Sequence, residues 1–250
     1  MSSKDLLRRI LAIVLALLTW QAAAMIVGLD LLLVSPVTVL KRLGTIWLEP
    51  DFWQALGFSL SRIAAGFGLA FIFGTLAAFA AGRFRLIETL LWPYMAAIKS
   101  VPVASFIIIA LIWLSARQLS VFISFLMVFP ILYANVLQGI RSTDPRLLEM
   151  AALYKVPWRR RLHYIYLPQI KPYLISASSV ALGLSWKAGI AAEVIGVAQG
   201  SIGEKLYESK IYFLTADLFA WTVVIVLVSV LFEKAATLLL RRGFRELEKR

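Results

Sequence analysis

Residues 54–81 read QALGFSLSRIAAGFGLAFIFGTLAAFAA, an apolar stretch whose single charged residue is Arg62. A helix needs about 20 apolar residues to cross the hydrocarbon core of a bilayer, so this stretch is long enough to span a membrane. Small residues recur at every fourth position, at Gly66, Ala70, Gly74, Ala78 and, just beyond the stretch, Gly82. Such a stripe lets helix backbones approach closely in lipid, and we therefore expect it to be a helix-packing face.

The rest of the chain shares this apolar character. Of its 250 residues, 61% are hydrophobic and 16% are charged, and the mean hydropathy is +0.83. A soluble domain is about 45–50% apolar and about 25% charged, so too few polar residues remain to coat a water-soluble globule. The absence of cysteine excludes a disulfide scaffold. The composition predicts an all-α membrane protein, a single polytopic helical bundle.

Six stretches are candidate spans: Ile10–Leu33, Gln54–Ala81, Leu90–Ser115, Leu119–Ile140, Pro168–Gly196 and Ala216–Leu240. The fifth is too long for one plain crossing, so we expect a span followed by a short apolar piece, Gly189–Gly196, that dips back or lies at the interface. The chain then divides into a first helix with an external amphipathic segment (1–53), a core membrane domain (54–240) with a cytoplasmic loop (141–167), and a basic cytoplasmic tail (241–250).

The basic residues orient the six spans. Six crossings place 17 of the 26 Lys and Arg residues on the side of the two termini and 5 on the opposite side. The positive-inside rule therefore places both termini in the cytoplasm. The alternative is a cleavable signal peptide, since Lys4, Arg8 and Arg9 precede an apolar run with Ala22–Ala24 as a cleavage site. The apolar run continues to Val34, which favours a retained first helix.

Residues 141–168 read RSTDPRLLEMAALYKVPWRRRLHYIYLP and contain the longest and most basic loop of the cytoplasmic side. Asp144 before Pro145 is a helix-start signal, a capping side chain followed by proline in the first turn. We expect a short amphipathic helix over Arg146–Tyr154, a turn at Pro157, and a basic, aromatic-rich helix over Trp158–Leu167. Two such helices would form a protruding docking element on the cytoplasmic face. The alternative is a loop that binds the anionic headgroups of lipids.

This loop resembles the EAA loop of the membrane-spanning subunits of binding-protein-dependent ABC importers. That family's pattern is Glu-Ala-Ala, three residues, Gly, nine residues, then Ile-x-Leu-Pro. Two positions depart from this pattern: Met150 replaces the usual first alanine and Lys155 replaces the usual glycine. Glycine suits a turn with positive φ, a backbone conformation that costs lysine more free energy. Pro157 supplies a turn of its own. The residues that match at this spacing are Glu149, Ala151, Ile165, Leu167 and Pro168.

Further stretches resemble the nitrate/sulfonate/taurine-type permeases of that family. With the loop, the resemblance covers roughly residues 33–242. The stretches are VSP at 34–36, SLSR at 59–62, KSVP at 99–102, GLSWK at 183–187 and AAE at 191–193.

The resemblance implies a type I ABC importer permease fold in a bacterial inner membrane. Two permease subunits, usually a homodimer, form the pathway, and an external solute-binding protein delivers a small solute. A separate cytoplasmic ATPase subunit binds ATP and Mg, and Glu149 is the expected contact with it, with Ala151 and Leu167 packed around that contact. The chain has no phosphate-binding loop of its own, because the nearest imitation, Gly196–Lys205, lacks the Gly-Lys-Ser/Thr ending. The sequence reveals neither the substrate nor whether the pair is a homodimer or a heterodimer.

Charges inside spans suggest a pathway. Ionisable residues there are costly and usually face a cavity or a partner. Lys99 lies about ten residues into the third span, near mid-depth at about 1.5 Å per residue. The hypothesis is that Lys99 attracts an anionic or polar solute; the alternative is a structural ion pair of Lys99 or Lys187 with Glu193. The candidate pathway residues are Lys99, Pro102, Ser185, Trp186, Lys187 and Glu193.

Two other classes of function fit the sequence less well. An ATP-independent channel or secondary transporter usually has inverted repeats or broken helices in matching halves, which the sequence does not show. A membrane-embedded enzyme needs clustered catalytic groups or a metal set. The chain has one histidine, His163, no cysteine and no acidic cluster, so we expect neither catalysis nor a metal site.

Overall fold

Five helices of the structure, a computed structural model that describes residues 3–248, are long and apolar enough to cross a membrane. The predicted all-α class is confirmed, since the described part of the chain contains no β-strand. The five are α1 (Ser3–Val27), α3 (Pro50–Arg83), α6 (Ala116–Arg141), α9 (Leu167–Gly196) and α11 (Thr215–Glu248). The shorter elements are α2 (Pro36–Ile46), α4 (Arg85–Ser100), α5 (Val103–Ala110), α7 (Pro145–Leu153), α8 (Trp158–Arg161), the π-helical turn η1 (Leu162–Tyr166) and α10 (Ile202–Ile211).

The predicted third span is not one straight helix. It is the pair α4 and α5, bent by 105° at a short break, and counting this pair as one span gives six. Pro102 explains the break, because a proline disfavours helical backbone at the residue before it, and Val101 is extended with φ −83° and ψ 134°. The Leu90–Ser115 span is therefore broken, and the position of Lys99 near mid-depth stays a prediction. Lys99 lies in the last turn of α4 and is exposed.

The predicted fifth span is one continuous helix, and the expected break at Gly189 is wrong. Helix α9 runs without interruption to Gly196 and is about 45 Å long at about 1.5 Å per residue. Gly189 serves close packing: an added Cβ would lie 2.6 Å from Ile63 Cγ1 and 2.7 Å from Ser124 Oγ. The helix ends at Val197, whose φ is +49°.

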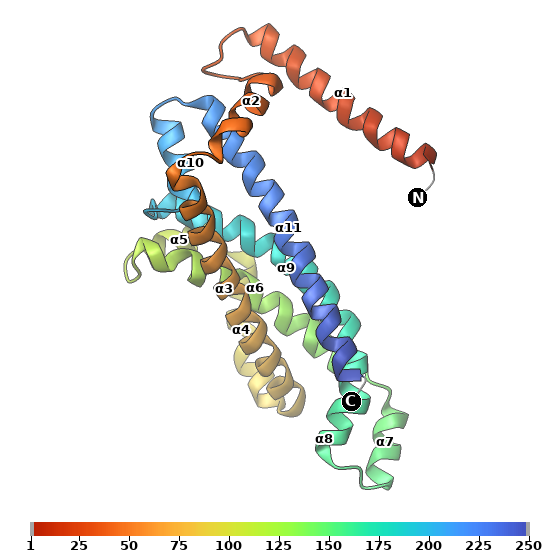
Figure 1. The fold of residues 1–250 in the computed structure, drawn as a ribbon. Coiled ribbons are helices and arrows are strands. Elements are labelled where there is room, and N and C mark those ends of the chain that lie inside the picture. Colours follow the sequence, from red (N-terminus) through yellow and green to blue (C-terminus); the bar gives the residue numbers. More distant parts are fainter. Residues whose placement is uncertain (1–2, 249–250) are drawn as a thin grey trace.

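Helix α6 lies between α3 and α9 and packs along both of them (Figure 1). The small-residue stripe of α3 faces α6: an added Cβ at Gly66 would lie 2.5 Å from the Val121 carbonyl oxygen, and one at Gly74 would lie 3.2 Å from Leu132 Cβ. On the other side, an added Cβ at Gly139 of α6 would lie 3.2 Å from the Cα atom of Ile170 in α9. Close backbone approach therefore holds these three helices together.

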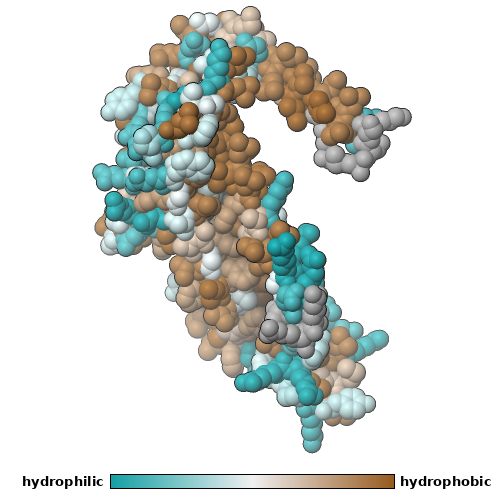
Figure 2. Space-filling view, in the orientation of Figure 1, coloured by the Kyte–Doolittle hydropathy of each residue, from teal (hydrophilic) through white to brown (hydrophobic). Residues whose placement is uncertain are grey.

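The two ends of the molecule differ. Helices α7 and α8 form a hairpin at one end, and α2 and α10 lie at the other (Figure 1). Hydrophobic residues cover α1 and the middle of the bundle, whereas hydrophilic residues gather towards the ends (Figure 2). Helix α1 extends away from the bundle and touches it through α2 and through the Trp20 and Phe219 rings, 5.5 Å apart.

The expected terminal segments fall partly outside the described residues. The expected tail at 241–250 is helical up to Glu248 as the end of α11. Lys249 and Arg250 of this tail, and Met1 and Ser2 of the expected first unit, lie outside the described residues.

Replacing Gly66 by alanine tests the α3–α6 contact. The new Cβ meets the backbone of α6, so we expect Gly66→Ala to lower the free energy of unfolding by about 1–3 kcal/mol. Gly68 is the matched control, because nothing lies within 4 Å of an added Cβ there. Gly68→Ala is expected to keep or slightly raise stability. Denaturant unfolding of the purified protein in detergent measures both, and equal effects of the two substitutions would contradict the contact.

Candidate functional site

The first helix of the hairpin, α7, starts and ends by local signals. The Asp144 side chain accepts a hydrogen bond from the Arg146 backbone N–H at 2.9 Å, and Pro145 occupies the first turn. The helix covers Pro145–Leu153, as the sequence predicted for Arg146–Tyr154 within a residue or two. A proline suits this position because the first N–H groups of a helix have no partner within it.

The turn after α7 places a lysine in left-handed backbone. Lys155 has φ +51°, and its N–H donates to the Ala152 carbonyl at 3.1 Å. The Val156 N–H donates to the Ala151 carbonyl at 2.9 Å, which completes a Schellman motif. The turn thus has the geometry that glycine favours, although the chain carries lysine there.

Arg161 fastens the two arms of the hairpin. Its Nε donates to the Val156 carbonyl at 2.7 Å and its Nη2 donates to the Ala151 carbonyl at 2.9 Å. Ala151 lies in the last turn of α7 and Val156 in the turn that follows it, where carbonyl groups lack the hydrogen bonds of a continuing helix. Trp158 packs on Tyr166 with ring centroids 5.5 Å apart. The predicted second helix is α8 followed by η1, which leads directly into α9.

The outer surface of α7 is exposed and largely apolar. Glu149 is exposed among Met150, 50% exposed, and Leu153, 77% exposed. Ala151 is 1% exposed and faces the interior of the hairpin. We expected Ala151 to pack around the Glu149 contact. It lies on another side of the helix instead, because residues two apart do not face each other. Pro157 and Pro168 are exposed, and Ile165 and Leu167 are half-buried.

A buried carboxyl group lies at the opposite end of α9. Glu193 is fully buried, and its Oε2 accepts a hydrogen bond from Ser59 Oγ of α3 at 2.6 Å. Ser59 Oγ in turn accepts from the Ile202 N–H at 3.0 Å, and the Gly203 N–H donates to Glu193 Oε2 at 3.4 Å. Buried Ser120 of α6 completes the polar surroundings of the carboxyl group. Glu193 thereby joins α3 and α9 to the start of α10.

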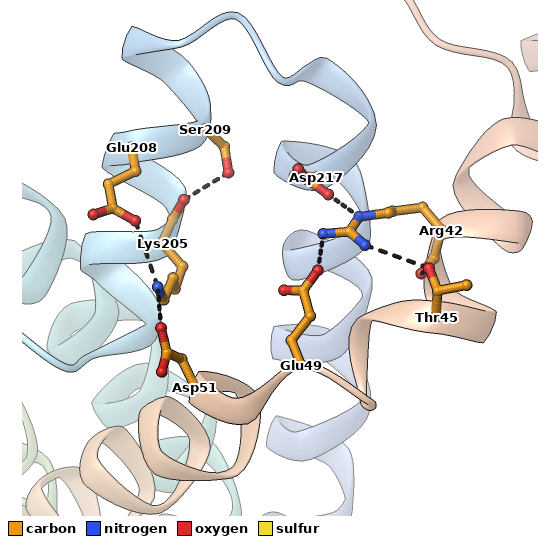
Figure 3. A network of polar contacts seen from close by, with 8 residues as sticks. All are labelled: Arg42, Thr45, Glu49, Asp51, Lys205, Glu208, Ser209 and Asp217. Carbon is orange, nitrogen blue, oxygen red and sulfur yellow. Dashed lines mark hydrogen bonds and ion pairs between the residues drawn. The ribbon is translucent and has the colours of Figure 1, made fainter.

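Ion pairs connect four helices at this same end (Figure 3). The Arg42 guanidinium of α2 donates to Asp217 in the first turn of α11 and to Glu49 just before α3. Lys205 Nζ of α10 lies 3.2 Å from Asp51 Oδ2 of α3. The pKa of Lys205 is raised, because burial lowers it but the hydrogen bond to Asp51 and the charge of Glu208 raise it by more.

Residues 70–245 match the family described as "Binding-protein-dependent transport system inner membrane component". The chain belongs to this family. It is 26% identical over 210 residues to a putative aliphatic sulfonates transport permease protein of Bacillus subtilis, which covers 83% of this chain and 75% of the relative. It is 25% identical over 235 residues to a taurine transport system permease protein of Escherichia coli (92% and 85%). A bicarbonate transport system permease protein of Synechococcus elongatus is 31% identical over 146 residues (58% and 52%).

The chain is thus the permease subunit of a binding-protein-dependent ABC importer for a small solute, a multi-pass protein of the inner membrane. The resemblance to the nitrate/sulfonate/taurine-type permeases is confirmed by these relatives. The family is a transport family and its members named here are permeases, which fits a protein that is not an enzyme.

The structure does not bring the candidate pathway residues of this permease together on one surface. Ser185, Trp186 and Glu193 are buried inside the bundle, whereas Lys99, Pro102 and Lys187 are exposed. Within residues 3–248, Glu193 forms no ion pair with Lys99 or Lys187; its carboxyl group is hydrogen-bonded to Ser59. The buried residues hold helices together in this arrangement, and Ser124 Oγ likewise donates to the Ser185 carbonyl at 3.0 Å.

Sequence reasoning missed three functional contacts. Ser59 and Glu193 are 134 residues apart, and Arg42 and Asp217 are 175 apart, so no local pattern connects them. Arg161 lies within the basic helix predicted over Trp158–Leu167, and that prediction gave it no partner. The signal that could have singled it out was its position after a helix end, where free carbonyl groups attract arginine.

Replacing Lys155 by glycine relieves the positive φ of the hairpin turn. We expect Lys155→Gly to raise the free energy of unfolding by about 0.5–1 kcal/mol, because glycine adopts this backbone without steric cost. Thermal unfolding of the purified permease measures the change. Arg159→Gly, in helical backbone of α8, is the control and is expected to be neutral or destabilising by up to about 1 kcal/mol. A destabilising Lys155→Gly would refute the turn geometry.

Removing the Glu193 carboxyl group tests its fastening role. We expect Glu193→Ala to lower the free energy of unfolding by about 2–4 kcal/mol, because Ser59 and the Gly203 N–H lose their acceptor and a void remains. Lys187→Ala, exposed on the same helix, is expected to change it by less than about 0.5 kcal/mol. If Glu193→Ala unfolds like the wild type in denaturant yet alters solute uptake, the carboxyl group serves the pathway instead.

Proposed function

We propose that the hairpin of residues 141–167 is the coupling element of this permease and that the outer face of α7 binds a separate ATPase subunit. The observation that carries the proposal is the exposed apolar face of α7. Leu153 and Tyr154 are 77% and 74% exposed, and Met150 lies beside them. Such an apolar patch at the tip of a basic, polar hairpin is typical of a protein-binding site.

The fixed geometry of the hairpin supports this role. The Schellman turn and the two hydrogen bonds of Arg161 hold the end of α7 against α8. An interface that is already ordered loses less conformational entropy on binding than a mobile loop. Because η1 and α9 continue directly from α8, a force on α7 reaches the bundle through a helix rather than through a flexible linker.

Charge at the hairpin adds specificity. Glu149 is the acidic group on the exposed face of α7, so it suits a basic residue on the ATPase. The same hairpin carries the exposed basic residues Arg146, Arg159 and Arg160. Charges of this kind orient a partner and speed association more than they add affinity. ATP and Mg are bound by the partner subunit in this proposal, and the permease supplies only the docking surface.

The remaining parts of the proposal concern assembly and solute. Two copies of the permease form the pathway, both termini lie in the cytoplasm as the distribution of basic residues indicates, and an external binding protein delivers the solute at the end that carries α2 and α10. The relatives are named for sulfonates, taurine and bicarbonate, so a small solute with an oxyanion group is the proposed substrate class.

Co-purification from the native membrane in mild detergent tests the coupling surface. We expect Leu153→Glu to reduce the recovered ATPase subunit at least about tenfold, because it places a charge in the apolar contact. Glu149→Ala is expected to weaken recovery less. Tyr212→Glu is the matched control, since Tyr212 is 70% exposed at the other end of the molecule, and it is expected to retain the ATPase.

Two outcomes would contradict the proposal. One is equal recovery of the ATPase with Leu153→Glu and with Tyr212→Glu. The other is solute uptake by vesicles that contain the permease alone without ATP, which would make it a channel or a secondary transporter. Uptake assays use taurine, an alkanesulfonate and bicarbonate, with a neutral sugar as the comparison solute.

A further inference from the structure

A polar groove runs between α9 and α11 on the half of the bundle that carries the hairpin. Its main part is a cavity of about 650 Å³, and an adjoining cavity of about 360 Å³ shares Ser179, Thr237 and Arg241 with it. Four of the lining residues on α11 recur at every fourth position, so they lie along one face of the helix. They are Glu233, Thr237, Arg241 and Arg245.

The mouth of this groove is strongly basic. Lys171, Arg241 and Arg245 line the main cavity, and no carboxylate lines it. Arg241 and Arg245 have no ion-pair partner in the part of the chain that the structure describes; Lys171 is engaged in an interaction of its own. Two uncompensated guanidinium groups one helical turn apart suit a phosphate group, which arginine binds in bidentate fashion.

Hydroxyl groups supply further donors in the groove. Ser176 and Thr237 line the main cavity, and the Thr237 hydroxyl is buried without a hydrogen-bond partner. The one carboxylate of the groove, Glu233, lies at the inner end, where it accepts a hydrogen bond from Ser179 Oγ at 2.5 Å. Lys234 lines that inner part as well. The carboxylate is therefore separated from the basic mouth by two helical turns of α11.

The groove lies where the apolar part of the bundle ends. Val180 and Leu238 line its inner part and are 64% and 45% exposed, and Leu239 beside them is 67% exposed. Hydrophilic residues cover the lower end of α11 directly below an apolar stretch of the same helix (Figure 2). A phosphate at Arg241 and Arg245 would thus sit at headgroup depth, with acyl chains along the exposed apolar residues.

We propose that this groove binds the headgroup of an anionic phospholipid, with Arg241 and Arg245 holding the phosphate and Thr237 donating a hydrogen bond to it. Basic pockets between membrane helices are known to bind such headgroups. The apolar residues at the inner end of the groove favour a lipid over a free anion, since a free anion gains nothing from them. The site goes beyond the proposed function and needs neither the ATPase nor the solute.

Native mass spectrometry of the purified permease complex tests the site. The complex is incubated with equal amounts of phosphatidylglycerol and phosphatidylcholine, and the retained lipid is identified from the mass that it adds to the complex. We expect wild type to retain phosphatidylglycerol about tenfold better. The double variant Arg241→Gln and Arg245→Gln is expected to lose this preference. The matched control, Lys41→Gln with Lys210→Gln, removes the same charge from exposed positions outside the groove and the hairpin and is expected to keep it.

Three results would overturn the proposal. The first is equal retention of the two lipids by wild type, a comparison that needs no variant. The second is an unchanged preference in both the double variant and Thr237→Val, which removes a single hydroxyl group and leaves the charges in place. The third is displacement of phosphatidylglycerol by inorganic phosphate at equal concentration, which would make the groove a site for a free anion.

Discussion

Small residues let α3, α6 and α9 approach so closely that their backbones touch, and the rest of the molecule is arranged around this contact. Lipid tails are as apolar as leucine, so burial of leucine side chains gives little force between helices in a membrane. Close approach gives dispersion contacts instead: at Gly66 and Gly189 an added methyl group would overlap a neighbouring helix. Helix α6 is held on both sides, by α3 and by α9, and α9 runs as one continuous helix along it.

Because α9 is continuous, it connects two distant features. One end follows the hairpin through η1, and the other end carries Glu193, which fastens α3 and the start of α10. A displacement of the hairpin is therefore carried along a helix of about 45 Å to the outer end of the bundle. The ion pairs of Arg42 and Lys205 join α2, α3, α10 and α11 there, so these helices respond together.

Short-range sequence patterns correctly predicted those parts of the fold that depend only on neighbouring residues in the chain. The capping pair Asp144 and Pro145 predicted α7, and the four-residue stripe of α3 lies against α6. Non-local features were not predictable. Hydropathy predicted one span over residues 90–115, although the chain bends by 105° next to Pro102. Gly189 suggested a break in the helix, although its lack of a side chain makes room for Ile63 and Ser124. The partners of Glu193 lie on other helices, so periodicity could not assign them.

The claim that α9 moves as one body is the centre of this account, and hydrogen exchange of the permease–ATPase complex with and without bound ATP tests it most directly. The account predicts that amides 170–194 stay equally protected in both states, because buried residues recur along α9 from Ile170 to Glu193. A loss of protection confined to Gly183–Gly189 in one nucleotide state would reveal a hinge within the helix and would contradict the account.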